Sequence, residues 1–397
     1  MRDRILESQH LGLGLAAAAA AAAAATAYLL LTSPHTASPV LPFAAAAVAA
    51  PRPANDRRKT APSPKWTVLP TLSTLARDEL PYPPDALPGA RDVATAYGNL
   101  RIYEFGPEDA EERVLLLHGI GTPCLALGAS PRNFFGRGYS DAPLDIPHDA
   151  RLYTTQVLLA LASSALPGWT GNDAFHLLGY SLGGAIAAAF ASSHPHLVKS
   201  LTLVAPGGLV RSAAHVGWRS RLLYSAAWIP EPVRRWLVAR RITPADPGTG
   251  GDVPEKETVD DDNNDMAAEW DDLRLVGGRR IGDVVRWQAQ THPGYVKSYM
   301  STIRHAPLYD RGGEEWRDLA EALQARRSGA EPGLRKGRVL FVLGDRDDIV
   351  VPGETVWDAE AVLGEDAVEV VVLKGGHEIA ITKGRDIVGA VVSAWQR

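Results

Sequence analysis

The sequence predicts an α/β fold: a mainly parallel, doubly wound sheet, an inserted helical cap and an N-terminal transmembrane or signal-anchor helix. Three observations support this fold class. Short apolar segments alternate with helix-like segments after residue 100, and such alternation is typical of parallel sheets covered by helices. A glycine-rich turn joins one apolar segment to a helix of small residues, and a long insertion divides the alternating pattern into two parts.

Composition excludes several classes of protein. The chain has 397 residues, of which 46% are hydrophobic and 22% charged, so it can bury a sizeable core and is not disordered throughout. Its net charge of −5 provides no positive field for binding nucleic acid. The single cysteine, Cys124, excludes an intramolecular disulfide. No metal-type spacing or glycine-rich phosphate loop is present, so no cofactor is implied.

Residues 1–31 are predicted to be a membrane anchor. Within them, residues 11–31 are uncharged and largely apolar, which is long enough for one helix to span a bilayer. Because many of these residues are alanines, a cleaved signal peptide and a low-complexity tail are the alternatives. Arg2 and Arg4 precede the span and the next arginine or lysine is Arg52, which favours a cytosolic N-terminus. We therefore expect a single-pass, membrane-anchored protein; its organelle is left open, and the secretory pathway is one of the options.

The rest of the chain divides by composition. Residues 32–90 are rich in proline, alanine and serine and are predicted to be a linker. Residues 91–206 and 308–397 are predicted to form one α/β domain, into which residues 207–307 insert as a cap. Within the cap, residues 252–272 contain ten acidic residues and one lysine, which predicts a solvated, mobile segment.

Six apolar segments are predicted to be strands, because each is short and bounded by turn residues. They are residues 100–105, 114–117, 175–178, 200–204, 338–343 and 367–373.

The most specific motif is Gly-Tyr-Ser-Leu-Gly-Gly at 179–184, directly after the third predicted strand and before a helix over 185–190. A strand-to-helix turn this tight needs glycines on both sides, because side chains there would collide with the strand or the helix. It would expose the Ser181 hydroxyl above the sheet at a helix N-terminus. Ser181 is therefore a candidate nucleophile; the alternative is a serine in an ordinary turn.

A serine nucleophile needs a base and an acid that orients the base. The fifth predicted strand is followed by Asp345, Asp347 and Asp348, and the sixth by His377. The carboxyl ends of parallel strands meet at one edge of the sheet, so these residues are expected near Ser181. His377 is the predicted base and Asp347 the preferred acid, with Asp348 and Asp345 left open.

These residues, in this order, together with His-Gly-Ile-Gly at 118–121 after a strand, resemble the α/β-hydrolase superfamily and its serine esterases and lipases. The resemblance covers residues 100–397 except the acidic segment. It implies hydrolysis of carboxylic esters with small or lipid-like acyl groups. It also implies that the backbone N–H groups of Leu182 and Ile120 form the oxyanion hole, and that His118 is structural.

Other reactions of the family can be compared with this chain. Its haloalkane dehalogenases and epoxide hydrolases have an aspartate where this chain has Ser181, so acyl transfer to water is expected. Peptidases and carbon–carbon bond hydrolases share the Ser-His-Asp arrangement and stay open. The predicted partners are a small-molecule ester or lipid substrate and, through the N-terminal helix, a membrane. The oligomeric state is left open.

The first part of the predicted cap combines tryptophans with arginines. Residues 218–242 contain three tryptophans, six arginines and one acidic residue. Two interpretations stay open: the tryptophans pack inside the cap while the arginines face water, or the segment lies against an anionic membrane. His292 and His305 are expected to be surface or packing residues rather than ligands.

One segment is too short for the fold. Gly-Arg-Gly-Tyr-Ser-Asp at 136–141 resembles a turn that follows the fourth strand of the family, yet only residues 120–135 separate it from Gly119. A helix, two loops and a strand need roughly 20 to 25 residues. We therefore expect part of this crossover to be missing, as in a truncated isoform or gene model. A second functional hypothesis follows: a catalytically impaired, membrane-tethered binding or scaffold protein.

Overall fold

The structure is a computed structural model. It describes residues 59–124, 133–166, 168–244, 273–274, 278–310, 314–329 and 331–396. The predicted anchor and the acidic segment 252–272 lie outside these ranges. In the part of the chain that the structure describes, no helix has the length and apolar character needed to cross a membrane.

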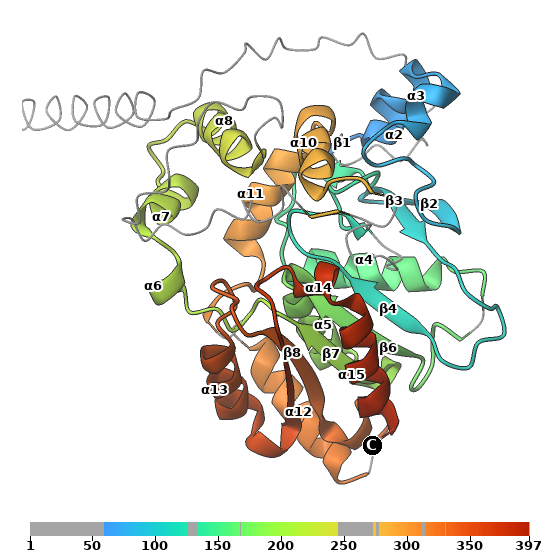
Figure 1. Cartoon of the computed structure of the whole chain (residues 1–397), viewed down its shortest axis with the longest axis vertical. Coiled ribbons are helices and arrows are strands. Elements are labelled where there is room, and N and C mark those ends of the chain that lie inside the picture. Colours follow the sequence, from blue (N-terminus) through green and yellow to red (C-terminus); the bar gives the residue numbers. More distant parts are fainter. Residues whose placement is uncertain are drawn as a thin grey trace, which may run out of the picture. The chain divides into compact units, whose positions relative to one another are not determined.

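A five-stranded parallel sheet forms the centre of the described domain (Figure 1). Its strands, in spatial order, are β4 (Val114–Leu117), β6 (Phe175–Tyr180), β7 (Val198–Val204), β8 (Val339–Gly344) and β9 (Val368–Leu373). Five of the six predicted strands are confirmed here. Apolar runs of this kind form strands because a parallel sheet is buried on both faces.

Helices cover both faces of this sheet. On α12 (Glu315–Arg327), Trp316 stacks on Phe341 of β8, whereas on α15 (Gly384–Gln396), Trp395 stacks on His176 of β6. The strand register gives Phe341 and His176 opposite parity, so the two side chains point to opposite faces. The predicted doubly wound arrangement is therefore confirmed. The other helices that flank the sheet are α4 (Ala150–Ala162), α5 (Leu182–Ser193) and α13 (Pro352–Leu363), and the short α14 (Ile379–Thr382) lies near α15.

The predicted linker is wrong for residues 59–90, which belong to the folded domain. They form β1 (Thr60–Ala61), α2 (Pro64–Thr67), α3 (Thr74–Asp78) and the start of a hairpin made by β2 (Ala90–Thr95) and β3 (Gly98–Tyr103). The Tyr82 side chain is fully buried, and its hydroxyl oxygen lies 2.9 Å from that of Tyr103 on β3. The prediction of a linker rested on the proline content of this segment. Composition carries no information on the contacts that such a segment makes with a distant strand.

Strand β4 lies at the edge of the sheet. Among the described residues, no strand pairs with its outer side, and the next strand, β5 (Ala142–Pro143), pairs with β1 instead. The turn before β5 bonds to β3: Asn133 donates to the Arg101 carbonyl at 3.2 Å, and Asp141 donates to the Asn99 carbonyl at 2.8 Å. The position of β4 at the edge agrees with the expected shortened crossover, and the two bonds provide partners for carbonyl groups of β3.

The cap consists of helices inserted between β7 and β8. They are α6 (Ser212–His215), α7 (Trp218–Ser225), α8 (Glu231–Ile242), α10 (Ile281–Thr291) and α11 (Tyr295–His305). Helices α7 and α8 pack against α11, as Figure 1 shows.

Of the two interpretations left open for the cap tryptophans, inward packing is wrong for Trp218, Trp228 and Trp236, which are all exposed. The inward positions are taken by Val238 and Arg234. The arginine can be buried because its guanidinium donates hydrogen bonds to backbone carbonyls. His292 is a packing residue, as expected: its Nε2 donates to the Ser140 carbonyl at 2.8 Å. His305 is exposed.

Candidate active site

Ser181 occupies the tight turn between β6 and α5. Its backbone has φ 53° and ψ −119°, a left-handed conformation that is strained for a residue with a side chain. Two glycines make the turn possible. A Cβ on Gly179 would lie 2.2 Å from the Gly183 carbonyl oxygen, and a Cβ on Gly183 would lie 2.2 Å from the Leu117 carbonyl oxygen. The motif therefore needs glycine at both positions.

Three side chains predicted from different parts of the sequence form a hydrogen-bonded chain. His377 Nε2 lies 3.0 Å from Ser181 Oγ, and His377 Nδ1 lies 2.9 Å from Asp347 Oδ2. Both His377 and Asp347 are buried. A carboxylate accepts, so Nδ1 carries the proton and Nε2 has its lone pair free to accept the serine proton.

The structure distinguishes between the three candidate acids. Besides His377, the Asp347 carboxylate accepts two backbone N–H bonds through Oδ1, from Ile349 at 3.0 Å and from Val350 at 2.8 Å. Asp345 instead accepts from the Gly375 N–H at 2.9 Å, and Asp348 is exposed. Of the three, Asp347 is the one that contacts the imidazole, and the backbone donors fix the orientation of its carboxylate.

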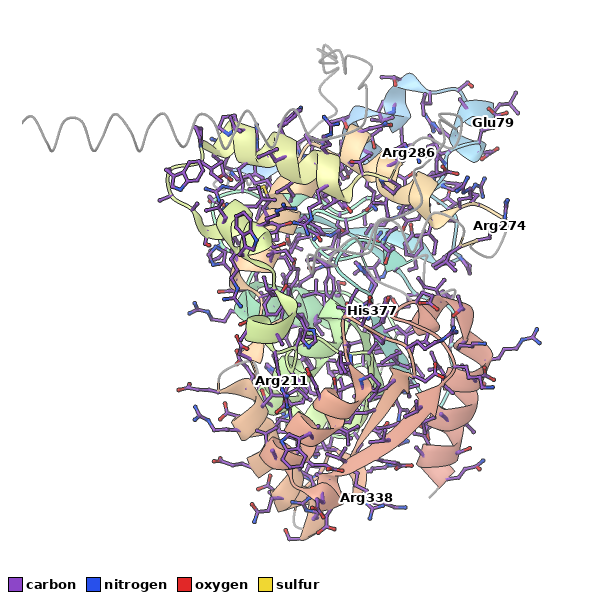
Figure 2. All side chains as sticks on the ribbon, turned by 60° about the vertical axis from the view of Figure 1, so that its left-hand side comes forward. Glu79, Arg211, Arg274, Arg286, Arg338 and His377 are labelled. Atoms are coloured by element: carbon purple, nitrogen blue, oxygen red, sulfur yellow. The ribbon has the colours of Figure 1, made fainter. Side chains whose placement is uncertain are left out.

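The loop that carries His377 is held at the carboxyl end of the sheet. The Tyr180 hydroxyl donates to the His377 carbonyl at 3.0 Å, so the strand that precedes Ser181 also positions the predicted base. Figure 2 shows His377 near the level where the cap meets the sheet, whereas Arg338, directly before β8, lies at the opposite end.

The loop after β4 lies against Ser181. A Cβ on Gly119 would lie 3.5 Å from Ser181 Cβ. His118 Nδ1 donates to the Gly119 carbonyl at 2.7 Å, and its Nε2 accepts from the Phe134 N–H at 2.9 Å. Burial lowers the pKa of His118 to about 3, so the ring is neutral and fits both bonds. The carbonyl that His118 holds belongs to the same peptide unit as the Ile120 N–H.

Two residues that the sequence analysis did not single out hold the next part of this loop. The fully buried Arg137 donates through Nε to the Ile120 carbonyl at 2.5 Å, and the Tyr295 hydroxyl of α11 donates to the Gly121 carbonyl at 2.9 Å. Arg137 also donates to Ser298 Oγ at 2.7 Å, and its guanidinium lies over the Tyr295 ring. For Arg137, the signal available in the sequence was an arginine between two glycines, Gly136 and Gly138.

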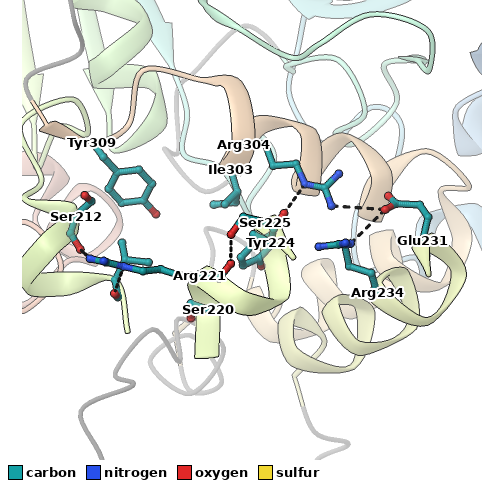
Figure 3. A pocket seen from close by; sticks show the side chains of 11 residues that line it. Ser212, Ser220, Arg221, Tyr224, Ser225, Glu231, Arg234, Ile303, Arg304 and Tyr309 are labelled. Carbon is teal, nitrogen blue, oxygen red and sulfur yellow. Dashed lines mark hydrogen bonds and ion pairs between the residues drawn. The ribbon is translucent and has the colours of Figure 1, made fainter. Parts of the chain in front are cut away.

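A separate cavity of about 750 Å³ lies in the cap among α7, α8 and α11 (Figure 3). Neither Ser181 nor His377 lines it. Its charged side chains already have partners: Arg304 donates to the Tyr224 carbonyl at 2.9 Å and lies 3.5 Å from Glu231. The cavity is therefore distinct from the group of residues around Ser181.

Comparison with known proteins adds the following. A family model described as the alpha/beta hydrolase fold matches residues 133–384, which is more than half of the chain and includes Ser181, Asp347 and His377. No curated protein matches the chain in sequence.

Several solved structures are similar at low identity. One, from a study of carboxylesterases of the thaumarchaeon Nitrososphaera gargenis, is 14% identical and covers 77% of this chain and 98% of its own, with a TM-score of 0.49. Carboxylesterase CesB of Bacillus subtilis is 16% identical, covers 77% and 90%, and has a TM-score of 0.48. The meta-cleavage product hydrolase CumD of Pseudomonas fluorescens IP01 is 14% identical, covers 77% and 97%, and has a TM-score of 0.47.

Proposed function

The chain belongs to the alpha/beta hydrolase fold family, and on this premise we propose that it is a serine hydrolase of carboxylic esters. The observation that carries the proposal is the hydrogen-bonded chain from Asp347 through His377 to Ser181. A serine hydroxyl becomes a useful nucleophile when a base takes its proton and an acid orients that base. A protein that only binds ligands would need none of these three side chains in contact.

Acylation follows from this arrangement. Ser181 Oγ attacks the ester carbonyl carbon while His377 Nε2 takes the hydroxyl proton. Asp347 keeps the other imidazole proton on Nδ1 and stabilises the imidazolium that forms. The N–H groups of Leu182 and Ile120 are proposed to bind the oxyanion of the tetrahedral intermediate. The leaving alkoxide then takes the proton from Nε2, which frees the alcohol and leaves an acyl-enzyme on Ser181.

Deacylation repeats these steps with water as the nucleophile. His377 takes a proton from the water, and the resulting hydroxide attacks the acyl carbonyl. Collapse of the second tetrahedral intermediate releases the carboxylic acid and returns the proton to Ser181 Oγ. The reaction needs no cofactor.

The proposed substrates are esters with small or medium apolar acyl chains, including lipid-like esters. We propose that residues 11–31 anchor the chain in a membrane as one span with a cytosolic N-terminus, because of their length, their lack of charge and the preceding arginines. A tethered enzyme meets lipid esters at a high effective concentration.

A serine-reactive probe tests the hydrolase. The full chain in detergent is treated with a fluorophosphonate beside Ser181→Ala, and both are then assayed with p-nitrophenyl esters of increasing acyl length. We expect labelling and turnover in the wild type, an optimum in acyl length, and neither signal in Ser181→Ala. Folded, monodisperse wild-type protein that is not labelled would refute the proposal and favour a tethered binding protein.

The anchor has its own test. Membranes from cells that express the full chain are extracted with alkaline carbonate, beside a variant that lacks residues 1–31. We expect the full chain to stay in the membrane pellet and the variant to leave it. Extraction of the full chain into the supernatant would contradict the anchor and leave the hydrolase proposal intact.

A further inference from the structure

The α7–α8 hairpin of the cap presents an apolar surface to solvent, which we call the Trp face. It consists of Trp218, Trp228, Val233 and Trp236, whose exposed fractions are 68%, 53%, 37% and 47%. These residues come from the first turn of α7, the connecting loop and the outward side of α8. Several large apolar side chains exposed on one hairpin indicate an interaction site.

Arginines accompany the tryptophans on this face. Between residues 218 and 242 the chain has six arginines and a single acidic residue, Glu231. One of the six, Arg234, is buried on the inner side, whereas Arg219 and Arg235 are exposed. The Arg219 guanidinium lies 5.5 Å from the ring centroid of Trp218, and the Arg240 guanidinium lies 5.7 Å from that of Trp236. The Trp face therefore combines exposed indole rings with guanidinium groups.

The fold does not need these tryptophans for its own packing. The hairpin is fixed from its inner side, where Val238 and Arg234 are buried. Arg234 donates to the Leu223 carbonyl at 2.5 Å and to the Ile229 carbonyl at 3.1 Å, which ties α8 to the end of α7 and to the loop. Substitutions on the outer side should leave this arrangement intact.

We propose that the Trp face binds the surface of a membrane that contains anionic phospholipids. Indole rings favour the boundary between headgroups and acyl chains, because one part of the ring is apolar and the N–H is polar. Guanidinium groups bind phosphate oxygens through paired hydrogen bonds, and an anionic leaflet attracts them over a longer range.

A soft surface explains the arrangement better than a protein partner does. The three indoles come from three separate positions of the hairpin, namely α7, the connecting loop and α8. Protein interfaces, in contrast, concentrate their binding energy in a central pocket surrounded by neutral contacts. The proposal depends neither on the hydrolase activity nor on the N-terminal anchor, and it would orient the cap toward the bilayer.

The chain allows a site-specific test, because its single cysteine, Cys124, is fully buried. Trp228→Cys and Trp236→Cys are each labelled with the environment-sensitive fluorophore NBD in the full chain. The matched control is Trp357→Cys on α13, where the native side chain is 66% exposed and lies outside the cap. All three proteins are added to phosphatidylcholine vesicles with and without phosphatidylserine. The wild type, treated with the NBD reagent in the same way, checks that Cys124 does not react.

In phosphatidylserine vesicles we expect the NBD emission at 228 and 236 to rise several-fold, to shift to shorter wavelength and to be quenched by brominated lipid. The label at 357 should keep its emission in water. Comparing positions within one chain separates the Trp face from any insertion of residues 11–31, because the anchor acts equally on all three proteins. High salt should weaken the response, because it screens the arginines.

A second measurement uses the native tryptophans. Quenching by brominated lipid is compared between the wild type, a Trp218→Ser/Trp228→Ser/Trp236→Ser variant and Trp357→Ser. We expect quenching to be largely lost in the triple variant and retained in Trp357→Ser. Equal NBD responses at 236 and 357 would overturn the proposal. So would a response at 236 that needs no lipid and follows a concentration-dependent dimer in sedimentation, which would assign the face to a second copy of the chain.

Discussion

Arg137 provides a test of how the loop beside Ser181 is held. Its guanidinium is fully buried, donates to the Ile120 carbonyl and to Ser298, and lies over the Tyr295 ring. Its Nη2 has no hydrogen-bond partner in the described part of the chain. If the Ile120 N–H is an oxyanion donor, Arg137 positions that donor from the adjacent peptide.

The perturbation is Arg137→Met, which keeps a long side chain and removes the donors. Leaving the Ile120 carbonyl without its donor costs about 1–3 kcal/mol, and losing the contact with Tyr295 costs about 1–2 kcal/mol. Against this, the variant no longer buries a charge, which in proteins costs several kcal/mol per ion. These terms largely cancel, so we expect a free energy of unfolding within about 2 kcal/mol of the wild type.

Activity should respond much more strongly than stability. Removing one oxyanion donor from a serine hydrolase lowers kcat by about 10² to 10³. Arg137→Met would displace the Ile120 N–H without removing it, so this range is the upper limit for the loss of kcat. We expect kcat for Arg137→Met to fall by about 10², with little change in KM, because the oxyanion exists only after attack. Arg137→Lys should be intermediate, since it keeps the charge without the planar donors.

The assay is kcat per active site, with sites counted by fluorophosphonate titration, beside urea unfolding of the same samples. Ser298→Ala is the matched control, because it removes a partner of Arg137 and leaves the bond to Ile120 in place. A purely structural role would lower the fraction of titratable sites and leave kcat per site unchanged. That result would refute the reasoning for Arg137, whereas a wild type without titratable sites would refute the hydrolase itself.

Three other predictions follow from single residues. Asp347→Asn should keep the fold and lower kcat by about 10⁴, because an amide donor would favour the wrong imidazole tautomer; ester turnover measures this, and unchanged turnover would exclude Asp347 as the acid. Gly183→Ala should abolish activity or folding, because its Cβ would lie 2.2 Å from a carbonyl oxygen of β4. Gly389→Ala has open space in α15 and should raise the free energy of unfolding by about 1 kcal/mol. Thermal unfolding that ranks the two variants in the opposite order would contradict this. Burial lowers the pKa of His148 to about 3 from an ordinary 6.5. Above pH 6.5 the side chain is neutral in both the folded and the unfolded chain, so the free energy of unfolding has its full value there. As the pH falls toward 3, the unfolded chain binds a proton that the folded protein does not, and the free energy of unfolding falls by up to about 1.4 kcal/mol per pH unit. His148→Leu should therefore lose less stability than the wild type between pH 7 and pH 5 in urea titrations, and parallel losses would show that the pKa is not lowered.

Several features of the fold could be predicted because their signals are contiguous in the sequence. The predicted strand over 114–117 agrees with β4 at both ends, since four apolar residues between polar neighbours define a strand locally. The turn around Ser181 could be predicted for the same reason: the glycines that it requires are two residues away on either side. The shortened segment before Gly136 was visible as a simple count of residues.

Other features depend on residues far apart in the sequence, and there the local signals failed. Proline content suggested a linker over 59–90, but Tyr82 is buried against β3. Helical spacing could not decide whether the cap tryptophans face inward, because burial depends on which distant segments cover a helix. In this cap, the buried guanidinium of Arg234 takes an inward position, and Trp236 stays outside.

The candidate site divides in the same way. The sequence by itself determined which residue types follow the strands, and so offered Ser181, His377 and three aspartates at one edge of the sheet. Only the tertiary structure decided that Asp347 contacts His377 and that Arg137, with α11, holds the loop after β4. The physical reason is that strand ends are encoded locally, whereas a hydrogen bond between residues 161 positions apart exists only once the chain has folded.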